Sequence, residues 1–475
     1  MTSVGCVAKR WIGTVVSLAI AGVAGTLCSA AGADTLEGSL GYAYVNNPTL
    51  NAQRASVRAT DETVPQALSG YRPRVSLSAS IAEQYLDTLT RTTGGAAAPP
   101  IRAVGATAVQ AYGGTITQTL FNGFQTANRT RQAEQLVSAA RETLRLAEQA
   151  VLLAAATAYM NLIRDTAVLD LQRRNVEVLQ EQVRQTRDRF NVGEVTRTDV
   201  AQSESRLAAA RATMLAAESN FVTSRATYRQ VIGLEPGRLA PASPVDRFSP
   251  RVLPQAIVVA RARHPSITTA MFNVDAALFQ VKIAEGALYP TLNLVGNVQK
   301  TYGSLSSINI LETFSASAAG QLTIPVYQGG TEYASIRQAK ETLQQRRTDL
   351  ETARDQAQQS LVQAWGQLEA AKAQIIATQS QVDASEIALN GVREEARVGQ
   401  RTTLDVLNAQ QELVNARVAL VTAQRDRVVA SYSLLAAAGG LSARTLSLAV
   451  PIYEPAVHYH QVRDNWAGVR TPDGK

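Results

Sequence analysis

The segment from residue 125 to residue 191 contains neither glycine nor proline. These two residue types end or weaken helices more strongly than any others, so the segment predicts one unbroken α-helix. At about 1.5 Å per residue, such a helix is about 100 Å long. Because no globular domain is that wide, the helix must lie in a coiled coil or a helical bundle.

The chain also repeats itself over most of its length. Short motifs recur in the same order at two constant offsets, 217 residues early in each unit and 206 residues further on. The pairs are Asn47-Pro48 with His264-Pro265, Arg72-Pro73 with Tyr289-Pro290, Asn122-Gly123 with Gln328-Gly329, Val192-Gly193 with Val398-Gly399, Asp199-Val200 with Asp405-Val406, and Ile232-Gly233 with Ala438-Gly439. This ordered series indicates two copies of one large unit, because its period is far too long for a solenoid repeat.

Both copies predict the same order of elements: a helix of moderate length, two strands, a long helix, a glycine-containing turn and a shorter return helix. The first copy, 34–250, places the strands at about 74–86 and 108–121 and the helices at about 49–69, 125–191 and 197–232. The second copy, 251–440, places the strands at about 291–302 and 314–326 and the helices at about 266–287, 331–397 and 403–438. A C-terminal tail, 441–475, follows.

Each return helix is about half as long as its partner. A second helix stacked end to end must therefore complete the pair, and the helix of moderate length has roughly the missing length. We expect each copy to contribute one long hairpin whose short arm is continued by that helix. The apolar stretch from Ala150 to Tyr159 is too short to cross a bilayer, so we expect it to be buried in the bundle.

The strands alternate between apolar and polar residues, as in Val75, Leu77 and Ile81 set against serines. Segments of roughly ten residues with this pattern suit a transmembrane barrel, and they suit a soluble half-buried sheet equally well. Four strands cannot close a barrel. Two chains give a barrel of eight strands, and side chains fill the interior of such a barrel. Three chains give twelve strands, which can enclose a lumen. Because a bilayer forbids open sheet edges, strands in a membrane require oligomerisation.

The N-terminus predicts export. Lys9 and Arg10 precede an apolar stretch at 12–27, and Ala31-Gly32-Ala33 forms a small-x-small cleavage site. This is the pattern of a signal peptide, which we assign to residues 1–33. The alternative is a membrane anchor, but the stretch is short for a span and contains several glycines. The net charge of +7 is spread along the chain, so nucleic acid is not an expected partner.

The sequence predicts no enzyme, no cofactor and no metal site. Both cysteines lie within the first 28 residues and there are only three histidines, which argues against a disulfide framework and a zinc site. No phosphate-binding loop, zincin helix or serine elbow is visible. The pair His458 and His460 could bind a metal, although an exposed tail is the simpler interpretation.

Two stretches carry a resemblance to a known family. Residues 189–200, which include Val192-Gly193 and Thr198-Asp199, and residues 396–409, which include Arg401 and Asp405, are similar to the two helix-turn tips of the TolC family. The resemblance extends over essentially all of the chain after residue 33. It implies a mainly α fold with a membrane β-barrel: a trimeric 12-stranded barrel, four strands per chain, continued by a long α-helical periplasmic tunnel. It also implies location in the outer membrane of a Gram-negative bacterium, in contact with lipid.

The tips are the expected gate of such a tunnel. Arg401 and Asp405 are four residues apart at the start of a predicted helix, so we expect them on one face, where the simple alternative is an ordinary surface ion pair. The resemblance implies that Arg401 ties to Thr198 and Asp199 of the other hairpin, and that Asp405 from three chains forms an acidic ring.

Two positions depart from the pattern of the best-known branch of the family. Asn408 stands where that branch has a second aspartate, and Ala396 stands where it has a tyrosine that helps to latch the tip. We therefore expect a weaker acidic ring and a closure that depends more on Arg401.

The turn residues of both tips, Val192-Gly193 and Val398-Gly399, are small and apolar, which suits contact with the helical hairpin of an adaptor. Glycine can equally be present only to permit the turn.

The leading functional prediction is the outer-membrane duct of a type I secretion system. Its partners would be an inner-membrane ABC transporter and a membrane-fusion adaptor, and its cargo an exported protein such as a calcium-binding repeat toxin. This follows from the resemblance, because the secretion branch usually lacks a lipidated cysteine at the mature N-terminus. The alternative within the family is the outer-membrane channel of a proton-driven multidrug efflux pump. Outside it, a trimeric adhesin and a soluble periplasmic scaffold remain possible.

Overall fold

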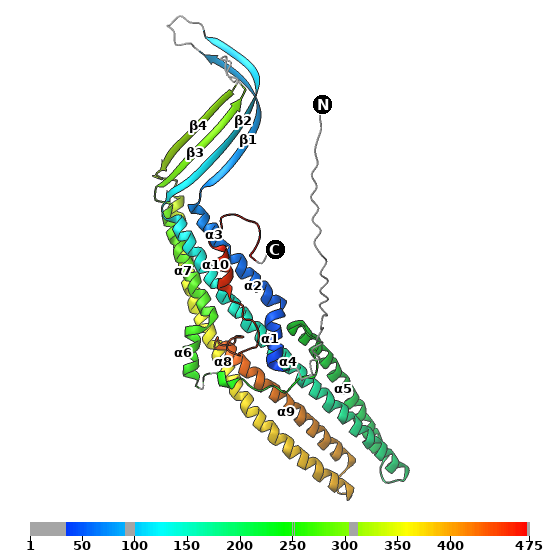
Figure 1. The fold of residues 1–475 in the computed structure, drawn as a ribbon. Helices are drawn as coiled ribbons and strands as arrows, with labels where there is room; N and C mark the ends of the chain where they lie inside the picture. The colour runs from blue at the N-terminus through cyan, green and yellow to red at the C-terminus, as the bar shows by residue number, and fades with distance from the viewer. Residues whose placement is uncertain (1–34, 91–99, 249, 251, 304–311, 473–475) are drawn as a thin grey trace, which may run out of the picture.

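The computed structural model describes residues 35–90, 100–248, 250, 252–303 and 312–472. The predicted signal peptide, 1–33, lies outside these described residues. The molecule is elongated, with a curved sheet at one end and two helical hairpins at the other (Figure 1). The first hairpin pairs α4 with α5 and the second pairs α8 with α9.

The hairpin helices have the lengths that the glycine and proline spacing predicts. The two long helices each contain 67 residues, and both turns are short. Their bounds are α4 at Gln125–Asn191, α5 at Arg197–Ile232, α8 at Thr331–Arg397 and α9 at Thr403–Ala437. Gly366 and Gly391 of α8 do not interrupt that helix.

A second helix continues each return helix, as expected. Asn47 caps the start of α2, Pro48–Asp61, and its side-chain amide also donates to the carbonyl of Val231 at the end of α5, over 2.8 Å. In the second copy, His264 caps α7, Pro265–Gly286, and lies directly against Gly439, just past the end of α9. The end-to-end stacking is confirmed in both copies.

The structure contains short helices that the sequence did not predict, and it divides one helix that was predicted as continuous. Two of them, α1 at Leu36–Asn46 and α6 at Leu253–Arg263, start each copy at the same offset of 217 residues. The helix expected at 49–69 is divided into α2, α3 at Thr63–Leu68 and a 3-10 turn, η1, at Ser69–Tyr71. The break has a physical cause, because Pro65 has no N–H to offer to the carbonyl of Asp61. A second 3-10 turn, η2, lies at Asp246–Phe248.

The four strands form one antiparallel sheet in the order β1-β2-β3-β4. Their bounds are β1 at Arg74–Thr90, β2 at Ile101–Asn122, β3 at Thr291–Tyr302 and β4 at Glu312–Thr323. The first two strands are longer than predicted, because the hairpin ladder continues to the pair Thr90 and Ile101 through residues that do not alternate regularly between apolar and polar. The fourth ends before 326, because Pro325 cannot donate to the ladder.

The sheet lies away from the helical body, which begins beyond one of its ends (Figure 1). All 12 residues of β4 are exposed, and large apolar side chains such as Leu77 and Phe314 point outward without cover. This arrangement does not suit a soluble half-buried sheet. The strands β1 and β4 are the open edges of the sheet within one chain.

The main apolar core lies in the middle of the molecule. It joins α1, the apolar part of α4, the ends of α5 and α9, and the start of the tail. An 18-residue window of α4 is apolar enough by length and composition to cross a membrane, but half of that window is buried inside the chain. Leu152, Ala155 and Tyr159 of α4 are fully buried in this core, as expected for part of a bundle.

The tail packs against this body. Leu441 is fully buried in the main core, and α10, Pro455–Val462, contacts α2. The reading of both tail histidines as exposed is wrong for His458, which is buried and whose Nδ1 lies 3.0 Å from a carboxylate oxygen of the buried Asp61. His460 is exposed.

Candidate functional site

The two hairpin tips have the same backbone structure. In the first, Gly193 adopts a φ of +84°, its N–H donates to the carbonyl of Phe190, and the N–H of Glu194 donates to that of Arg189. This is the Schellman motif, which ends a helix with a left-handed residue that glycine adopts without strain. The second tip repeats both hydrogen bonds around Gly399, at a φ of +83°.

The valine before each of these glycines is exposed. Val192 has 72% of its surface accessible and Val398 has 70%. A Cβ atom added at Gly193 or Gly399 would meet nothing within 4 Å, so steric crowding by neighbouring atoms does not require glycine at either position. The positive φ does require it, and the apolar valines remain available for contact outside the chain.

A capping box begins each return helix. The hydroxyl of Thr402 accepts from the N–H of Asp405, and the Asp405 carboxylate accepts from the N–H and the hydroxyl of Thr402, at 3.0 and 2.8 Å. Thr196 and Asp199 repeat these bonds. Donation from the backbone N–H and the hydroxyl of Thr402 holds the pKa of Asp405 below its ordinary value. The hydroxyl of Thr196, followed by its backbone N–H, likewise lowers the pKa of Asp199. Both aspartates are therefore ionised and engaged in their own turns.

The expected pairing of Arg401 with Asp405 on one helix face is wrong. Helix α9 begins at Thr403 with Thr402 as its cap, so Arg401 precedes the helix. Its Nε donates instead to Glu395 of the same hairpin over 2.8 Å, and this bond raises the pKa of Arg401. Asp405 acts on Arg401 only as a nearby charge.

The two hairpins are joined by a different pair of residues. Nη2 of Arg206, on α5, donates to Oδ1 of Asn408, on α9, over 2.8 Å. Beside it, Leu407 is only 3% exposed and packs among apolar residues of the first hairpin. This tip cluster consists of Val176, Leu179, Ala210 and Leu407, with Leu207 and Met214 at its margin. Asn408 is therefore a residue of the contact between hairpins.

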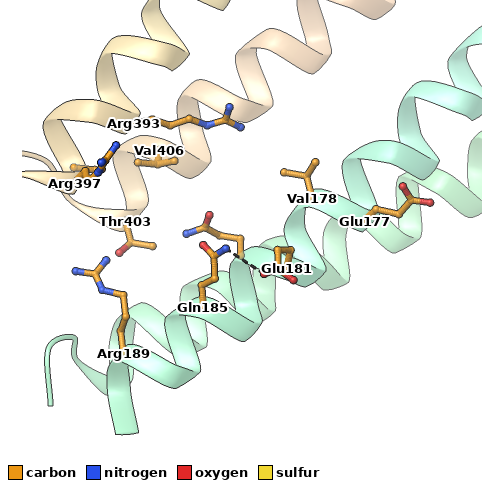
Figure 2. A pocket seen from close by; sticks show the side chains of 11 residues that line it. Glu177, Val178, Glu181, Gln185, Arg189, Arg393, Arg397, Thr403 and Val406 are labelled. Carbon is orange, nitrogen blue, oxygen red and sulfur yellow. Dashed lines mark hydrogen bonds between the residues drawn. The ribbon is translucent and has the colours of Figure 1, made fainter. Parts of the chain in front are cut away.

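A cleft of about 610 Å³ lies between the hairpins near the tips. Arg189 and Gln185 of α4 approach it from one side, and Arg393 and Arg397 of α8 from the other (Figure 2). Ala396 also lines it. The small side chain of Ala396 leaves open space where an aromatic ring could contact both hairpins.

The polar groups around the cleft are mostly paired within their own hairpin. Arg189 binds Glu194 at 3.0 Å, and Arg397 binds Glu394 at 3.3 Å. Arg393 donates to Gln410, also within its hairpin. The charged groups on each side of the cleft therefore have partners within their own hairpin, so moving the two hairpins apart breaks few ion pairs.

The structure does not bring all of the predicted gate residues together. Asp199 bonds within the first hairpin, while Arg401 and Asp405 bond within the second, and Thr198 is exposed. Asn408 alone of the five reaches the other hairpin. Arg206 was not predicted from the sequence, since no local motif marks a partner 202 residues away. The capping threonines, Thr196 and Thr402, were not predicted either, although a threonine followed three residues later by aspartate resembles the capping-box pattern.

Within the described residues, no group of three or more histidine, cysteine, aspartate or glutamate side chains is placed to hold a metal ion.

The comparison with protein families identifies the chain. The model of the outer membrane efflux protein family matches residues 40–234 and 256–440, one range in each copy. The chain belongs to this family. It is an outer-membrane protein, and its long helices form a large periplasmic part.

Characterised relatives cover nearly the same length. The chain is 42% identical to the outer membrane efflux protein BepC of Brucella suis, over 94% of both chains. It is 25% identical to the outer membrane protein TolC of Escherichia coli, over 85% of this chain and 82% of TolC. The alkaline protease secretion protein AprF of Pseudomonas aeruginosa is 26% identical over 70% of each chain.

The sequence first suggested a particular likeness to the Bordetella pertussis protein CyaE. That protein is 25% identical over 66% of this chain and 65% of its own, which is a more distant relation than the one to BepC.

Solved structures share the fold. The outer-membrane channel CmeC of Campylobacter jejuni superposes with a TM-score of 0.74 at 16% identity, over 90% of this chain and 89% of CmeC. A membrane protein from Pseudomonas aeruginosa gives the same score at 19% identity, over 88% of this chain and 92% of its own. The predicted fold class, mainly α with a membrane sheet, is confirmed.

Proposed function

We propose that three copies of this chain form an outer-membrane exit duct. The observation that carries the proposal is the four-stranded sheet with two open edges, set on hairpins about 100 Å long. In a bilayer the free edges of β1 and β4 must pair, and three copies close a barrel wide enough for a lumen. The helices of the three chains then continue that lumen as a tunnel through the periplasm.

The tips act as the gate of this duct. In one chain the Arg206–Asn408 bond and the tip cluster hold the second hairpin against the first. Arg401, Thr198 and Asp199 remain exposed or half-exposed at the tip, where they can meet the neighbouring chains of a trimer. Asp405 is ionised by its cap, so three copies of it place negative charge around the closed end.

The adaptor contacts the exposed valines at the ends of the hairpins. Val192 and Val398 each follow a helix end and present an apolar side chain that nothing in the chain covers. A partner with small apolar residues at its own hairpin turn could bury both. The inner-membrane transporter is reached through this adaptor.

The cargo of the duct is either an exported protein or small molecules. The resemblance to the secretion branch of the family favours protein export with an ABC transporter, and the relation to AprF, a protease secretion protein, is in keeping with it. The 42% identity to BepC, an efflux protein, favours small-molecule efflux. Since the two kinds of duct share one fold, the choice depends on the partners.

Deleting the gene separates the two cargoes. Loss of one or more proteins from the culture medium, with unchanged drug susceptibility, supports secretion. Hypersensitivity to several unrelated drugs with an unchanged set of secreted proteins supports efflux. A strain with neither change would contradict the duct.

The duct itself is tested by planar-bilayer recording of the detergent-purified protein. We expect a small, stable conductance from the wild type and a larger one from Arg401→Ala. A trimer that never conducts would contradict the proposal. A pore whose conductance Arg401→Ala leaves unchanged would retain the duct and remove Arg401 from the gate.

A further inference from the structure

The junction between the sheet and the helices is richer in arginine than in acidic residues. The segments 69–76, 117–131, 286–292 and 321–331, which meet at the base of the sheet, contain neither aspartate nor glutamate. They do contain four arginines, Arg72, Arg74, Arg129 and Arg131, of which the last three are exposed. A surface with one sign of charge attracts ligands of the opposite sign.

Exposed aromatic side chains share this level. Tyr71, Phe124, Tyr289 and Tyr327 lie just before or after the ends of strands, and each has more than half of its surface accessible. Aromatic rings gather at both borders of a membrane, because one part of the ring is apolar and another tolerates water. The base of the sheet therefore has the composition of a membrane border.

The C-terminal segment adds a tryptophan at this border. Arg72 lies two residues before β1, its Nη1 donates to the carbonyl of Asn465 over 2.6 Å, and its guanidinium carbon lies 4.7 Å from the ring centroid of Trp466. These contacts place Trp466 at the junction while 71% of its surface stays exposed. The segment after α10 lies beside α3, near the sheet end of the helical body (Figure 1). It also lies beyond residue 440, where the match to the family model ends.

We propose that this junction belt, Arg72, Arg74, Arg129, Arg131 and Trp466, binds anionic phospholipid headgroups of the inner leaflet of the outer membrane. The inference rests on the proposed function, because it needs the sheet inserted in a bilayer. Guanidinium groups suit phosphate through paired N–H donors, and indole rings settle at the headgroup level. Carboxylates flank the belt, but Glu134 pairs with Arg463 and Glu285 with Lys340. The four arginines therefore outnumber the other two flanking acids, Glu332 and Asp464, which favours an anionic lipid over a zwitterionic one.

The intrinsic fluorescence of Trp466 can report whether its side chain contacts lipid. The chain has three tryptophans, Trp11 in the predicted signal peptide, Trp365 in α8 and Trp466. A Trp365→Phe variant, purified as the full mature trimer, therefore fluoresces from Trp466 alone. It is reconstituted into vesicles of phosphatidylcholine, with or without phosphatidylglycerol, in which one of the two lipids is brominated near the headgroup end of its acyl chains.

We expect brominated lipid to quench at least half of the Trp466 emission, with brominated phosphatidylglycerol at least threefold more effective at equal mole fraction. The double variant Arg74→Gln, Arg131→Gln should lose that preference while quenching by phosphatidylcholine persists. Arg211→Gln, on α5 near the tips, is the matched control and should keep the preference. Trp466→Phe, which leaves Trp365 in the tunnel helices, should be unquenched.

Two results would overturn the inference. Equal quenching by the two lipids would show that the belt does not select anionic headgroups. Absent quenching, in a preparation that conducts in a planar bilayer, would show that Trp466 is covered by protein, such as a neighbouring subunit. A preparation that neither conducts nor is quenched would overturn the proposed function as well.

Discussion

Arg206 and Asn408 join the two hairpins of one chain near their tips, through a 2.8 Å bond from the guanidinium to the amide oxygen. The contact is exposed, and a hydrogen bond of this kind contributes about 0.5–1.5 kcal/mol. Such a value suits a gate, because a closure held much more tightly would not open when a partner docks. From the sequence, Asn408 was expected only to weaken an acidic ring by replacing an aspartate. In the structure it accepts the hydrogen bond that joins the two hairpins.

The packing next to this bond should hold the hairpins together more strongly than the bond itself. Leu407 is buried among Val176, Leu179 and Ala210, so Leu407→Ala leaves a cavity at the tip. We expect a loss of about 2 kcal/mol or more from the contact between hairpins. Faster amide hydrogen exchange in residues 403–410 and a higher bilayer conductance would report it.

Leu404→Ala is the control for that change, because Leu404 lies one turn away and is only half-buried. It should alter both readouts much less. Equal effects of the two substitutions would mean that the tip cluster has no special part in closure.

Filling the cleft between the hairpins should close the duct further. Ala396 lines that cleft of about 610 Å³, so Ala396→Tyr places an aromatic ring where both hairpins can contact it. We expect the conductance of the closed state to fall below that of the wild type. Ala396→Phe separates the ring from the hydroxyl, and a conductance above wild type in both variants would show that the ring forces the hairpins apart.

Acid should loosen the junction between α9 and α7. His264 caps α7 through Nδ1, which accepts from the N–H of Ser266 over 3.3 Å, and burial holds the pKa of His264 below 6.5. The folded state therefore prefers the neutral ring. Stability is complete above about pH 6.5 and falls as the pH drops from there towards the lowered folded pKa, since only the unfolded chain gains the proton in that window.

The first copy of the repeat supplies the control for this pH effect. Asn47 caps α2 at the equivalent position with an amide oxygen that does not titrate. His264→Asn should therefore keep the cap and flatten the dependence of the melting temperature on pH between 7 and 5. An unchanged pH dependence in His264→Asn would assign it to other groups.

The regular parts of this fold could be predicted from the sequence because glycine and proline mark their ends. Gly193 and Gly399 delimit the long helices, and Pro325 ends β4. The sheet was harder to predict, because residues 101–107 extend β2 without the regular alternation of apolar and polar side chains that identifies a strand.

The site was predicted less well than the fold, for two separate reasons. Arg401 was misplaced by local structure: α9 begins at Thr403 with Thr402 as its cap, so Arg401 lies before the helix and not on its face. Arg206 was missed because its partner is distant in the sequence, and helix periodicity cannot say which faces of two hairpins meet. Even the tail histidine, His458, needed the structure to be placed against Asp61.

The most direct test of the gate is the single-channel conductance of Arg206→Ala in planar bilayers, beside wild type, Asn408→Ala and the double variant. Arg211→Ala is the control, since Arg211 is an exposed arginine of the same helix that lines the groove between α4 and α5. The bond between hairpins predicts a severalfold rise in either single variant, no further rise in the double variant, and wild-type conductance in the control. Arg206→Ala and Arg211→Ala channels that both conduct like the wild type would contradict closure by this tie.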